Sequence, residues 1–221
     1  MSDRSPSDEE SGASTPATPS SREKILDTAE ALFARSGFSG VGMRTVSEQV
    51  GLGKSSLFYH FSSKVKLYCA VLERALEDFV ARLDEARVQD MPPVERLHTW
   101  VDGVVTALAE HPSWARLLLR SLFEEDIADE HDQQRIDTLF ESIVSRLSRA
   151  LEEGIRSGEI RPVSIPHTIQ TLIGMTLFHF ASGDLGEDLL GESVFEPKQI
   201  QLRREHIRHY LDHVLRTSPR T

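Results

Sequence analysis

The chain has 221 residues, and its 25 Lys and Arg stand against 35 Asp and Glu, which gives a formal net charge of −10. The 39% of hydrophobic and 27% of charged residues exclude a wholly disordered chain and are typical of a globular protein with its own core. The single cysteine, Cys69, excludes an internal disulfide framework and argues against a Cys-rich zinc site. No apolar run approaches the about 20 residues of a membrane-spanning helix, and the acidic N-terminus does not resemble a secretory signal. We therefore expect a cytoplasmic protein without membrane contacts.

The charge is distributed unevenly along the chain. Residues 1–19 carry one Arg and four acids among Ser, Thr and Pro, so we expect a disordered acidic tail there, because too little apolar surface offsets the entropy of ordering. Residues 20–68 carry seven basic and four acidic side chains, whereas residues 69–221 carry 17 basic and 27 acidic side chains. A basic island on an acidic chain indicates a local site for a polyanion, with statistical scatter as the alternative.

Apolar residues at helical spacing predict helices along the whole chain, and no segment alternates as a strand would. Ser20 and Ser63 are expected N-caps, Gly37 and Gly158 are expected helix ends, and the acidic run 124–132 is expected to be a loop. The predicted fold class is therefore all-α with about nine helices. They are expected near residues 20–37, 43–50, 54–61, 64–87, 97–108, 112–122, 136–158, 166–181 and 197–216.

Residues 43–61, with the sequence MRTVSEQVGLGKSSLFYHF, predict two short helices joined by a glycine turn, which is the helix-turn-helix arrangement. Gly51 supplies the positive φ that such a turn requires, and Ser47 is small enough to lie where the helices touch. Leu57 and Phe61 are expected to anchor the second helix to the core. Its outer face then carries cations, hydroxyls and aromatic rings without an acid, which suits a DNA groove.

This segment resembles the DNA-binding motif of the TetR family of bacterial transcription regulators. The resemblance in sequence is close over about residues 20–70. The rest of the chain agrees with the family only in helix count, length and proline placement. It implies an N-terminal three-helix DNA-binding domain at 20–66 and a C-terminal helical ligand-binding and dimerisation domain at 67–221. The matching positions are Val46-Ser47, Val50-Gly51-Leu52-Gly53-Lys54-Ser55-Ser56-Leu57-Phe58-Tyr59-His60-Phe61, Lys64 and Leu67.

The resemblance also implies which side chains touch DNA. Arg44 is the candidate for a bidentate guanine contact and Thr45 for a phosphate contact. On the recognition helix, Lys54, Ser55 and Ser56 are expected at base edges and phosphates. The remaining predicted contacts are Phe58 to a thymine methyl group, Tyr59 and His60 beside the DNA backbone, and Lys64 on a phosphate.

Three positions depart from the family pattern. Gly53 replaces the usual Ser, so the recognition helix is expected to be capped weakly. Ser55 replaces a common Gly, and Phe58 replaces a Tyr whose hydroxyl binds a phosphate. These differences bear on which operator sequence is recognised rather than on whether DNA is bound.

The predicted helix 166–181 is apolar on two sides, so we expect it to pack against two partners. One face is predicted to form a dimer interface with a stripe of the last helix, and the family resemblance implies a four-helix bundle there. The predicted dimer residues are Ile169, Ile173, Leu177, Phe180, Ile207, Tyr210, Leu211 and Val214. The resemblance further implies a cavity for a hydrophobic or amphipathic small molecule, with ordinary core packing as the alternative for each candidate. The candidate lining residues are Phe79, Trp100, Val104, Leu118, Phe140, Met175 and His179.

Taken together, the resemblance implies a DNA-binding transcription regulator. The expected protein is a homodimeric repressor that binds a palindromic operator and is released by a small-molecule effector, without a cofactor. An enzyme is the rival class, but the sequence contains no nucleophile elbow, HExxH or phosphate-binding glycine motif. A helical adaptor for protein partners is a further rival, and it would not need the basic outer face at 54–60.

Three histidines near the C-terminus raise the question of a metal. His206, His209 and His213 have a spacing at which neutral imidazoles can share one ion, although solvated histidines are common on such a helix flank. We predict no bound metal from this pattern.

Overall fold

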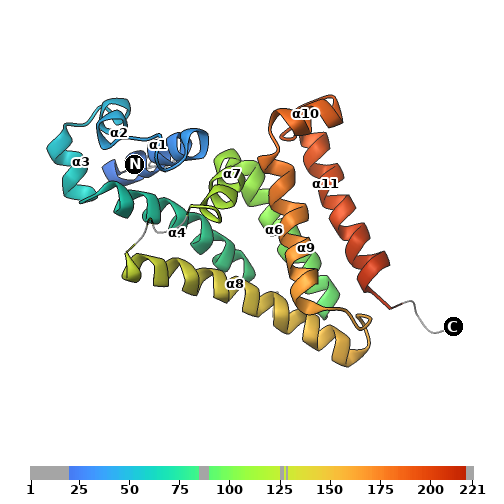
Figure 1. The fold of residues 1–221 in the computed structure, drawn as a ribbon. Helices are drawn as coiled ribbons and strands as arrows, with labels where there is room; N and C mark the ends of the chain where they lie inside the picture. Colours follow the sequence, from blue (N-terminus) through green and yellow to red (C-terminus); the bar gives the residue numbers. More distant parts are fainter. Residues whose placement is uncertain (1–19, 85–89, 125–126, 128, 218–221) are drawn as a thin grey trace, which may run out of the picture.

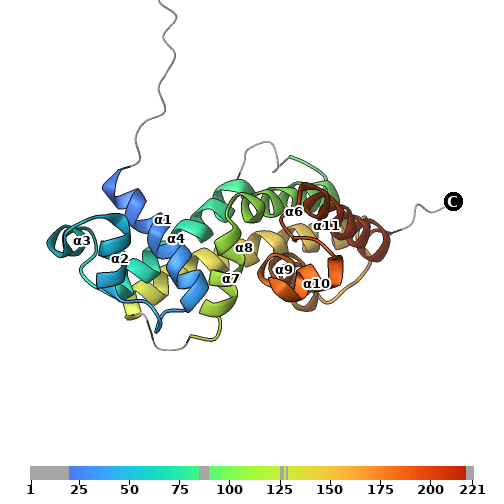
Figure 2. The same ribbon diagram turned by 90° about the horizontal axis from the view of Figure 1, so that it is seen from above.

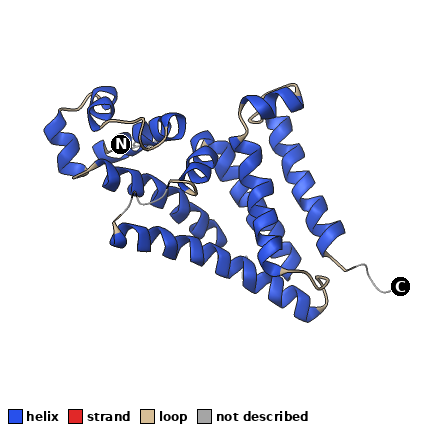
Figure 3. Cartoon of the chain, viewed as in Figure 1, coloured by secondary structure: helices blue, strands red, loops and turns tan. Residues whose placement is uncertain are grey.

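The computed structural model describes residues 20–84, 90–124, 127 and 129–217 of the chain. These residues form ten α-helices and no named strand, which confirms the all-α prediction (Figure 3). The tail predicted for residues 1–19 lies outside the described residues. The helices are α1 (Ser21–Ser36), α2 (Met43–Val50), α3 (Lys54–His60), α4 (Lys64–Leu83), α6 (Pro93–Glu110), α7 (Pro112–Ser121), α8 (Glu130–Ser157), α9 (Ile165–Ala181), α10 (Asp184–Leu190) and α11 (Pro197–Tyr210), followed by a π-helical turn at Leu211–Leu215.

Several helix boundaries follow caps that the sequence predicted. Ser20 forms a capping box with Glu23, in which each side chain accepts a hydrogen bond from the other residue's backbone N–H. The Ser63 hydroxyl oxygen accepts a backbone N–H in the first turn of α4. Gly37 and Gly158 end α1 and α8 with φ values of 69° and 79°.

Two parts of the helix prediction were wrong. We expected no helix at α10, because its seven residues give too few turns for a periodic pattern to show. Helix α8 begins at Glu130, inside the expected acidic loop, because the Asp129 side chain caps it by accepting the N–H of Asp132. The described part of α4 ends at Leu83, and its expected end near residue 87 lies outside the described residues.

The helices form two parts that share α4 (Figure 1). Helices α1, α2 and α3 gather at one end, and α4 runs from them into the larger part. There α8 lies alongside α4, and α6, α7, α9 and α11 complete the bundle. Seen from above, the molecule is elongated, with α3 at one end and α11 near the other (Figure 2). None of the described helices is both long and apolar enough to cross a membrane.

One continuous hydrophobic core joins the two parts. Helix α4 is buried along its whole described length, from Leu67 and Val71 beside the N-terminal helices to Phe79 and Leu83 in the larger part. Burial of such apolar surface contributes about 25 cal/mol per Å² and is the main stabilising term for a chain of this kind. Helix α4 therefore connects the packing of the larger part to that of the N-terminal helices.

A buried carboxylate ties α1 to α4 and α7. The Glu30 side chain accepts a hydrogen bond from the guanidinium of Arg74 in α4. It also accepts the indole N–H of Trp114 in α7, with an Nε1–Oε2 distance of 2.8 Å. Asp27 pairs with the same guanidinium at 2.6 Å. Removal of Glu30 would leave the buried indole N–H of Trp114 without its acceptor and would leave the half-buried Arg74 with Asp27 alone, which is costly in a region of low dielectric constant.

We therefore expect Glu30→Ala to lower the free energy of unfolding by about 2–3 kcal/mol, as measured by urea titration followed by circular dichroism. The control is Glu152→Ala, which removes an exposed carboxylate from α8 and should change stability by less than about 0.5 kcal/mol. Equal stability of the two variants would contradict a role for Glu30 in joining the helices.

Candidate DNA-binding surface and ligand cavity

The turn between α2 and α3 has the geometry that the glycine pattern predicted. Gly51 adopts the left-handed conformation, with φ 74° and ψ 28°. Ser47 is buried where the two helices meet, and its hydroxyl donates to the backbone carbonyl of Arg44 at 2.8 Å. Leu57 and Phe61 are 0% and 5% exposed and hold α3 against the core. Helices α2 and α3 therefore form a helix-turn-helix.

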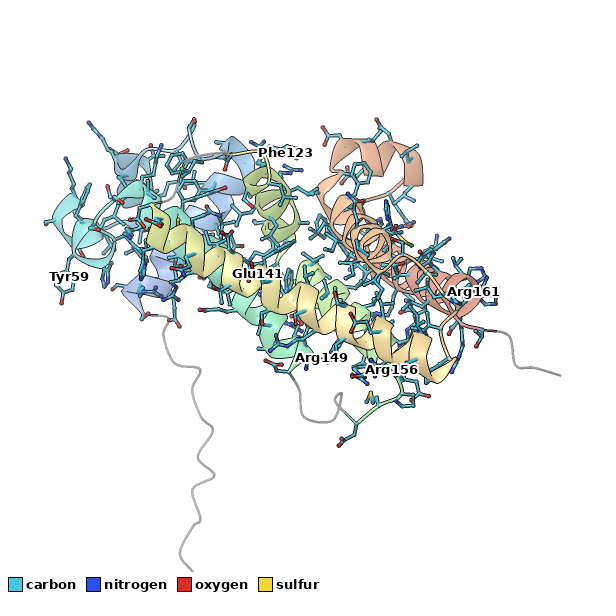
Figure 4. All side chains as sticks on the ribbon, turned by 60° about the horizontal axis from the view of Figure 1, so that its bottom comes forward. Tyr59, Phe123, Glu141, Arg149, Arg156 and Arg161 are labelled. Atoms are coloured by element: carbon cyan, nitrogen blue, oxygen red, sulfur yellow. The ribbon has the colours of Figure 1, made fainter. Side chains whose placement is uncertain are left out.

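The outer face of α3 is open to solvent. Four of its predicted DNA contacts are exposed, namely Lys54, Ser55, Phe58 and Tyr59. The other two, Ser56 and His60, are half-buried. The Lys54 ammonium lies 5.7 Å from the centroid of the Phe58 ring, which places a cation and an aromatic ring side by side on the surface. Tyr59 is 88% exposed and points away from the body of the molecule (Figure 4). As expected, Gly53 gives α3 no side-chain cap.

On α2, Arg44 and Thr45 are exposed, but Arg44 is already paired. Its guanidinium donates to Glu48 one turn later, with an Nε–Oε1 distance of 2.8 Å. This hydrogen bond and the Glu48 charge raise the pKa of Arg44. The sequence analysis did not name Glu48, although its spacing of four residues from Arg44 is the signal for such a pair. A bidentate contact of Arg44 with a base requires it to leave Glu48.

The Lys64 side chain already contacts another residue of the chain, Phe38. Its ammonium donates to the carbonyl of Phe38 at 3.1 Å and lies 4.1 Å from the centroid of the Phe38 ring. Phe38 belongs to the loop between α1 and α2, so Lys64 joins that loop to the start of α4. The role of Lys64 on a DNA phosphate stays a prediction, and it requires release from Phe38.

A cavity of about 300 Å³ lies between α4, α6, α7, α8 and α9. Five of the seven predicted lining residues border it: Phe79, Trp100, Val104, Leu118 and Phe140. Met175 and His179 do not; Arg203 of α11 donates to the backbone carbonyl of Met175, and its charge acts on His179. Ile173 and Leu177, which we predicted at a dimer interface, border the cavity instead.

The polar groups of the cavity are concentrated near the link between α7 and α8. They include Tyr68 and Glu124, which the sequence analysis did not single out as ligand residues. The Tyr68 hydroxyl donates to the Glu124 carboxylate, and this bond together with burial raises the pKa of Tyr68 well above its usual value. The acidic run of the sequence could have drawn attention to Glu124, but spacing alone does not show which of its acids faces inward.

Cys69 borders the same cavity and is 2% exposed. Burial raises the pKa of its thiol to about 12, and the nearby carboxylates of Asp132 and Glu73 act in the same direction. The thiol therefore stays protonated at neutral pH, as expected for a structural cysteine.

Half of the predicted dimer residues have no surface left for a partner. Ile169, Phe180, Ile207 and Leu211 are buried in the core of their own chain, so the prediction was wrong for these four. The error arose because α9 is apolar nearly all round, and periodicity does not show which apolar side faces the core. Of the remaining predictions on α11 and the turn after it, Val214 is 45% exposed and Tyr210 is half-buried.

A different stripe is exposed on α9 and α11. On α9 the exposed positions Thr171, Gly174 and Phe178 recur at helical spacing, and Phe178 is 57% exposed. A side-chain carbon added at Gly174 would meet no atom within 4 Å. On α11, which contacts α9, the exposed residues Leu202 and His206 lie four residues apart and therefore on one side of the helix. We call this set of residues the α9–α11 face.

The three C-terminal histidines are exposed, and their geometry does not indicate a metal site. The His209 and His213 rings stack with centroids 4.0 Å apart, and Nδ1 of His206 lies against a backbone carbonyl one turn earlier. In the described part of the chain, three candidate ligand atoms converge only at 129–132, in a group of two aspartates and one histidine. There the Lys66 ammonium already pairs with both aspartates, at 2.9 and 2.7 Å.

The exposed helix-turn-helix and the apolar cavity define a DNA-binding protein with a second site of small-molecule size. Comparison with family models agrees with this class. The model for bacterial regulatory proteins of the tetR family matches residues 25–71, and that for the tetracyclin repressor-like C-terminal domain matches residues 93–210, more than half of the chain. The chain belongs to the TetR family and is a helix-turn-helix transcriptional regulator.

Individual relatives are distant. RutR of Escherichia coli strain K12, an HTH-type transcriptional regulator, is 24% identical over 172 residues, which cover 77% of this chain and 78% of RutR. The transcriptional activator FasR of Mycolicibacterium smegmatis is 31% identical over 109 residues, about half of each chain.

Solved structures share the fold. The ketosteroid regulator KstR2 of Mycobacterium tuberculosis superposes with a TM-score of 0.75 at 19% identity, over 91% of this chain and 98% of its own. AibR in complex with isovaleryl coenzyme A and operator DNA superposes with a TM-score of 0.69 at 21% identity, over 86% of this chain and 97% of AibR.

His179, although it does not border the cavity, gives a testable pH dependence. Burial and the nearby Arg203 charge lower the pKa of His179 to about 4, and a hydrogen bond with the Val194 backbone opposes this only in part. Between pH 6.5 and 4 the unfolded chain therefore binds a proton at this position that the folded chain does not, so stability falls as the pH falls through this range.

We expect His179→Gln to remove about 1 kcal/mol of the stability loss between pH 6.5 and pH 5, measured by urea titration at both values. The exposed His167 on the same helix is the control, and His167→Gln should lose stability as the wild type does. An unchanged pH dependence in His179→Gln would contradict the assignment.

Proposed function

We propose that this regulator is a repressor that binds a palindromic operator as a homodimer and is released by an apolar or amphipathic small molecule. The observation that carries the proposal is the combination of the exposed outer face of α3 with a cavity bordered by α4, the helix that connects the two parts. Repression follows by steric exclusion of polymerase when an operator overlaps a promoter, and it is the commoner mode that the family resemblance implies.

The DNA-binding part of the proposal assigns the predicted contacts on α2 and α3 to the major groove. The N-terminal positions Lys54 and Ser55 of α3 are exposed together with Arg44 and Thr45 of α2, so that they can meet one stretch of duplex. We retain the division into residues 20–66 for DNA and 67–221 for ligand and dimer. The boundary falls within the first turn of α4, so the two parts are joined by a continuous helix.

The dimer in this proposal uses the α9–α11 face. Phe178 and Leu202 are large apolar side chains that the chain itself leaves exposed, and Gly174, one turn before Phe178, leaves room for a partner helix to approach closely. A two-fold dimer would present two α3 helices to half-sites about 34–36 Å apart. Joining two small contact surfaces raises the affinity, because the second binding event becomes intramolecular.

The ligand in this proposal occupies the cavity. Its volume of about 300 Å³ and its aliphatic and aromatic walls suit a small apolar body. Two of the structural neighbours are described with coenzyme A thioesters, AibR with isovaleryl coenzyme A and FadR of Bacillus subtilis with stearoyl-CoA, so thioesters are one class to test. A ligand that binds better when α4 is displaced would shift the population toward a form that fits DNA poorly.

The double variant Arg44→Ala/Lys54→Ala tests the DNA surface. We expect at least about 100-fold weaker binding to a duplex selected from a random pool, measured by fluorescence anisotropy, because each contact is worth about 1–3 kcal/mol. Glu48→Gln should instead tighten binding at low salt, since it frees Arg44 and removes a negative charge from the surface. The control Arg156→Ala/Lys198→Ala removes two exposed cations far from α3 and should bind as the wild type does. Full affinity in the first double variant would refute the assigned contacts.

Phe178→Glu tests the dimer. We expect sedimentation of a monomer at micromolar concentration and operator binding weakened about 100-fold, because a charge at the centre of an apolar interface loses its hydration and the avidity is lost. Phe123→Glu is the matched control, since Phe123 is 82% exposed near the link between α7 and α8 (Figure 4). A wild-type protein that sediments as a monomer would refute the homodimer itself.

A further inference from the structure

The Glu124 carboxylate occupies a position shared by the cavity and the DNA-binding part. It borders the cavity and accepts the hydroxyl of Tyr68, another cavity residue. Its Oε1 atom also accepts the backbone N–H of Phe38 at 3.0 Å. Phe38 lies in the loop that leads directly into α2, and its carbonyl is held by Lys64. One side chain is therefore bonded both to a wall of the cavity and to the loop in front of the helix-turn-helix.

The polar lining of the cavity is acidic. Two carboxylates border it, those of Glu124 and Asp137, and none of its described lining residues is Lys, Arg or His. Among the described residues, no salt bridge pairs Glu124 with a cation. The Arg120 guanidinium, four residues before Glu124, donates to the carbonyl of Arg35 at 3.4 Å; it does not border the cavity, although its charge acts on Tyr68 and opposes the rise of that pKa. A carboxylate or phosphate on a ligand would meet like charge at this end of the cavity.

The remaining walls suit a cation with an apolar body. Four aromatic rings border the cavity, those of Tyr68, Phe79, Trp100 and Phe140. The faces of such rings attract ammonium and guanidinium groups, and aromatic cages bind quaternary ammonium ions. The cavity also begins at the C-terminal end of α7, where Ser121 borders it and the helix dipole favours positive charge.

We propose that the effector is an amphipathic cation, with an ammonium or guanidinium head that binds the Glu124 carboxylate and an apolar body between α4, α6, α8 and α9. This inference rests on the proposed function, because it names the ligand class of the same cavity. It also gives Glu124 a second role, as the residue through which ligand binding reaches the DNA-binding part.

The second role follows from competition for one carboxylate. A cationic head offers Glu124 a charge-assisted bond, which is stronger than a bond from a neutral N–H. If Glu124 turns toward the head, the Phe38 N–H loses its acceptor in a half-buried position. An unpaired buried donor is costly, so the loop between α1 and α2 rearranges to regain a partner. The position of α2 and α3 relative to α4 changes with it.

The test compares three probes with the same chain length on the full-length protein, below their micellar concentrations. Decylammonium, decanoate and decanoyl-coenzyme A are titrated by calorimetry and, in parallel, against protein bound to its selected duplex by anisotropy. We expect the ammonium probe to bind at least about tenfold more tightly than decanoate and to release DNA at a correspondingly lower concentration. Tighter binding and DNA release by decanoate or decanoyl-coenzyme A would overturn this inference and leave the proposed function standing. Release by none of the three would overturn this inference, and release by no compound of a broad panel would in addition refute ligand control itself.

Glu124→Gln removes the charge while its amide oxygen can still accept the Phe38 N–H. We expect the preference for the ammonium probe over decanoate to fall about tenfold, and DNA release by that probe to weaken in parallel. Tyr68→Phe, which removes a competing donor from the carboxylate, should shift ammonium binding in the opposite direction, toward higher affinity. Glu141→Gln changes an exposed residue of α8 (Figure 4); it is the charge-matched control and should retain the wild-type preference.

An undiminished preference in Glu124→Gln would overturn the inference. Should that variant not fold, Tyr68→Phe decides the question alone, because weaker or unchanged ammonium binding there contradicts competition for the Glu124 carboxylate. Circular dichroism and the urea midpoint of each variant separate a loss of fold from a loss of binding.

Discussion

The structure depends on the burial of α4 along its whole described length. Its apolar residues pack against α1 at one end and against α6, α7 and α8 at the other, so the N-terminal helices have no separate core. This continuity constrains how the protein can respond to a ligand. Interiors are packed too densely for one end of a buried helix to move without displacing its neighbours, so in the proposed response a change in the cavity would reach α1 and α2 through packing as well as through Glu124.

Much of the N-terminal part was predictable, because local signals there agree with the tertiary structure. Ser20, Gly37 and Gly51 each act within a few residues of their position, and Leu57 is the single aliphatic residue of α3, with Phe61 four residues later on the same buried side. The same agreement let a family pattern be identified from about 50 residues. The helix α10 escaped prediction because two turns between glycines carry no periodic signal.

The C-terminal part was less predictable, because its helices pack on several sides. On α9, the residues Ile169 and Phe180 were expected at an interface and lie in the core, while Phe178 is the aromatic residue left exposed. Sequence spacing identifies stripes on a helix but not the neighbour that covers each stripe. Glu124 was missed for a related reason: its importance comes from contacts with Phe38 and Tyr68, which are more than 50 residues away in sequence.

The buried thiol of Cys69 in the cavity wall bears on whether ligand binding is reversible. Cys69 is the single cysteine of the chain, and it is kept protonated beside the space where a ligand would sit. A neutral thiol reacts slowly with electrophiles and oxidants, so we expect a small molecule in the cavity to leave Cys69 unmodified. Under the proposed function, ligand binding would therefore be reversible at this position, and dilution of the ligand would restore the DNA-binding form without any repair enzyme.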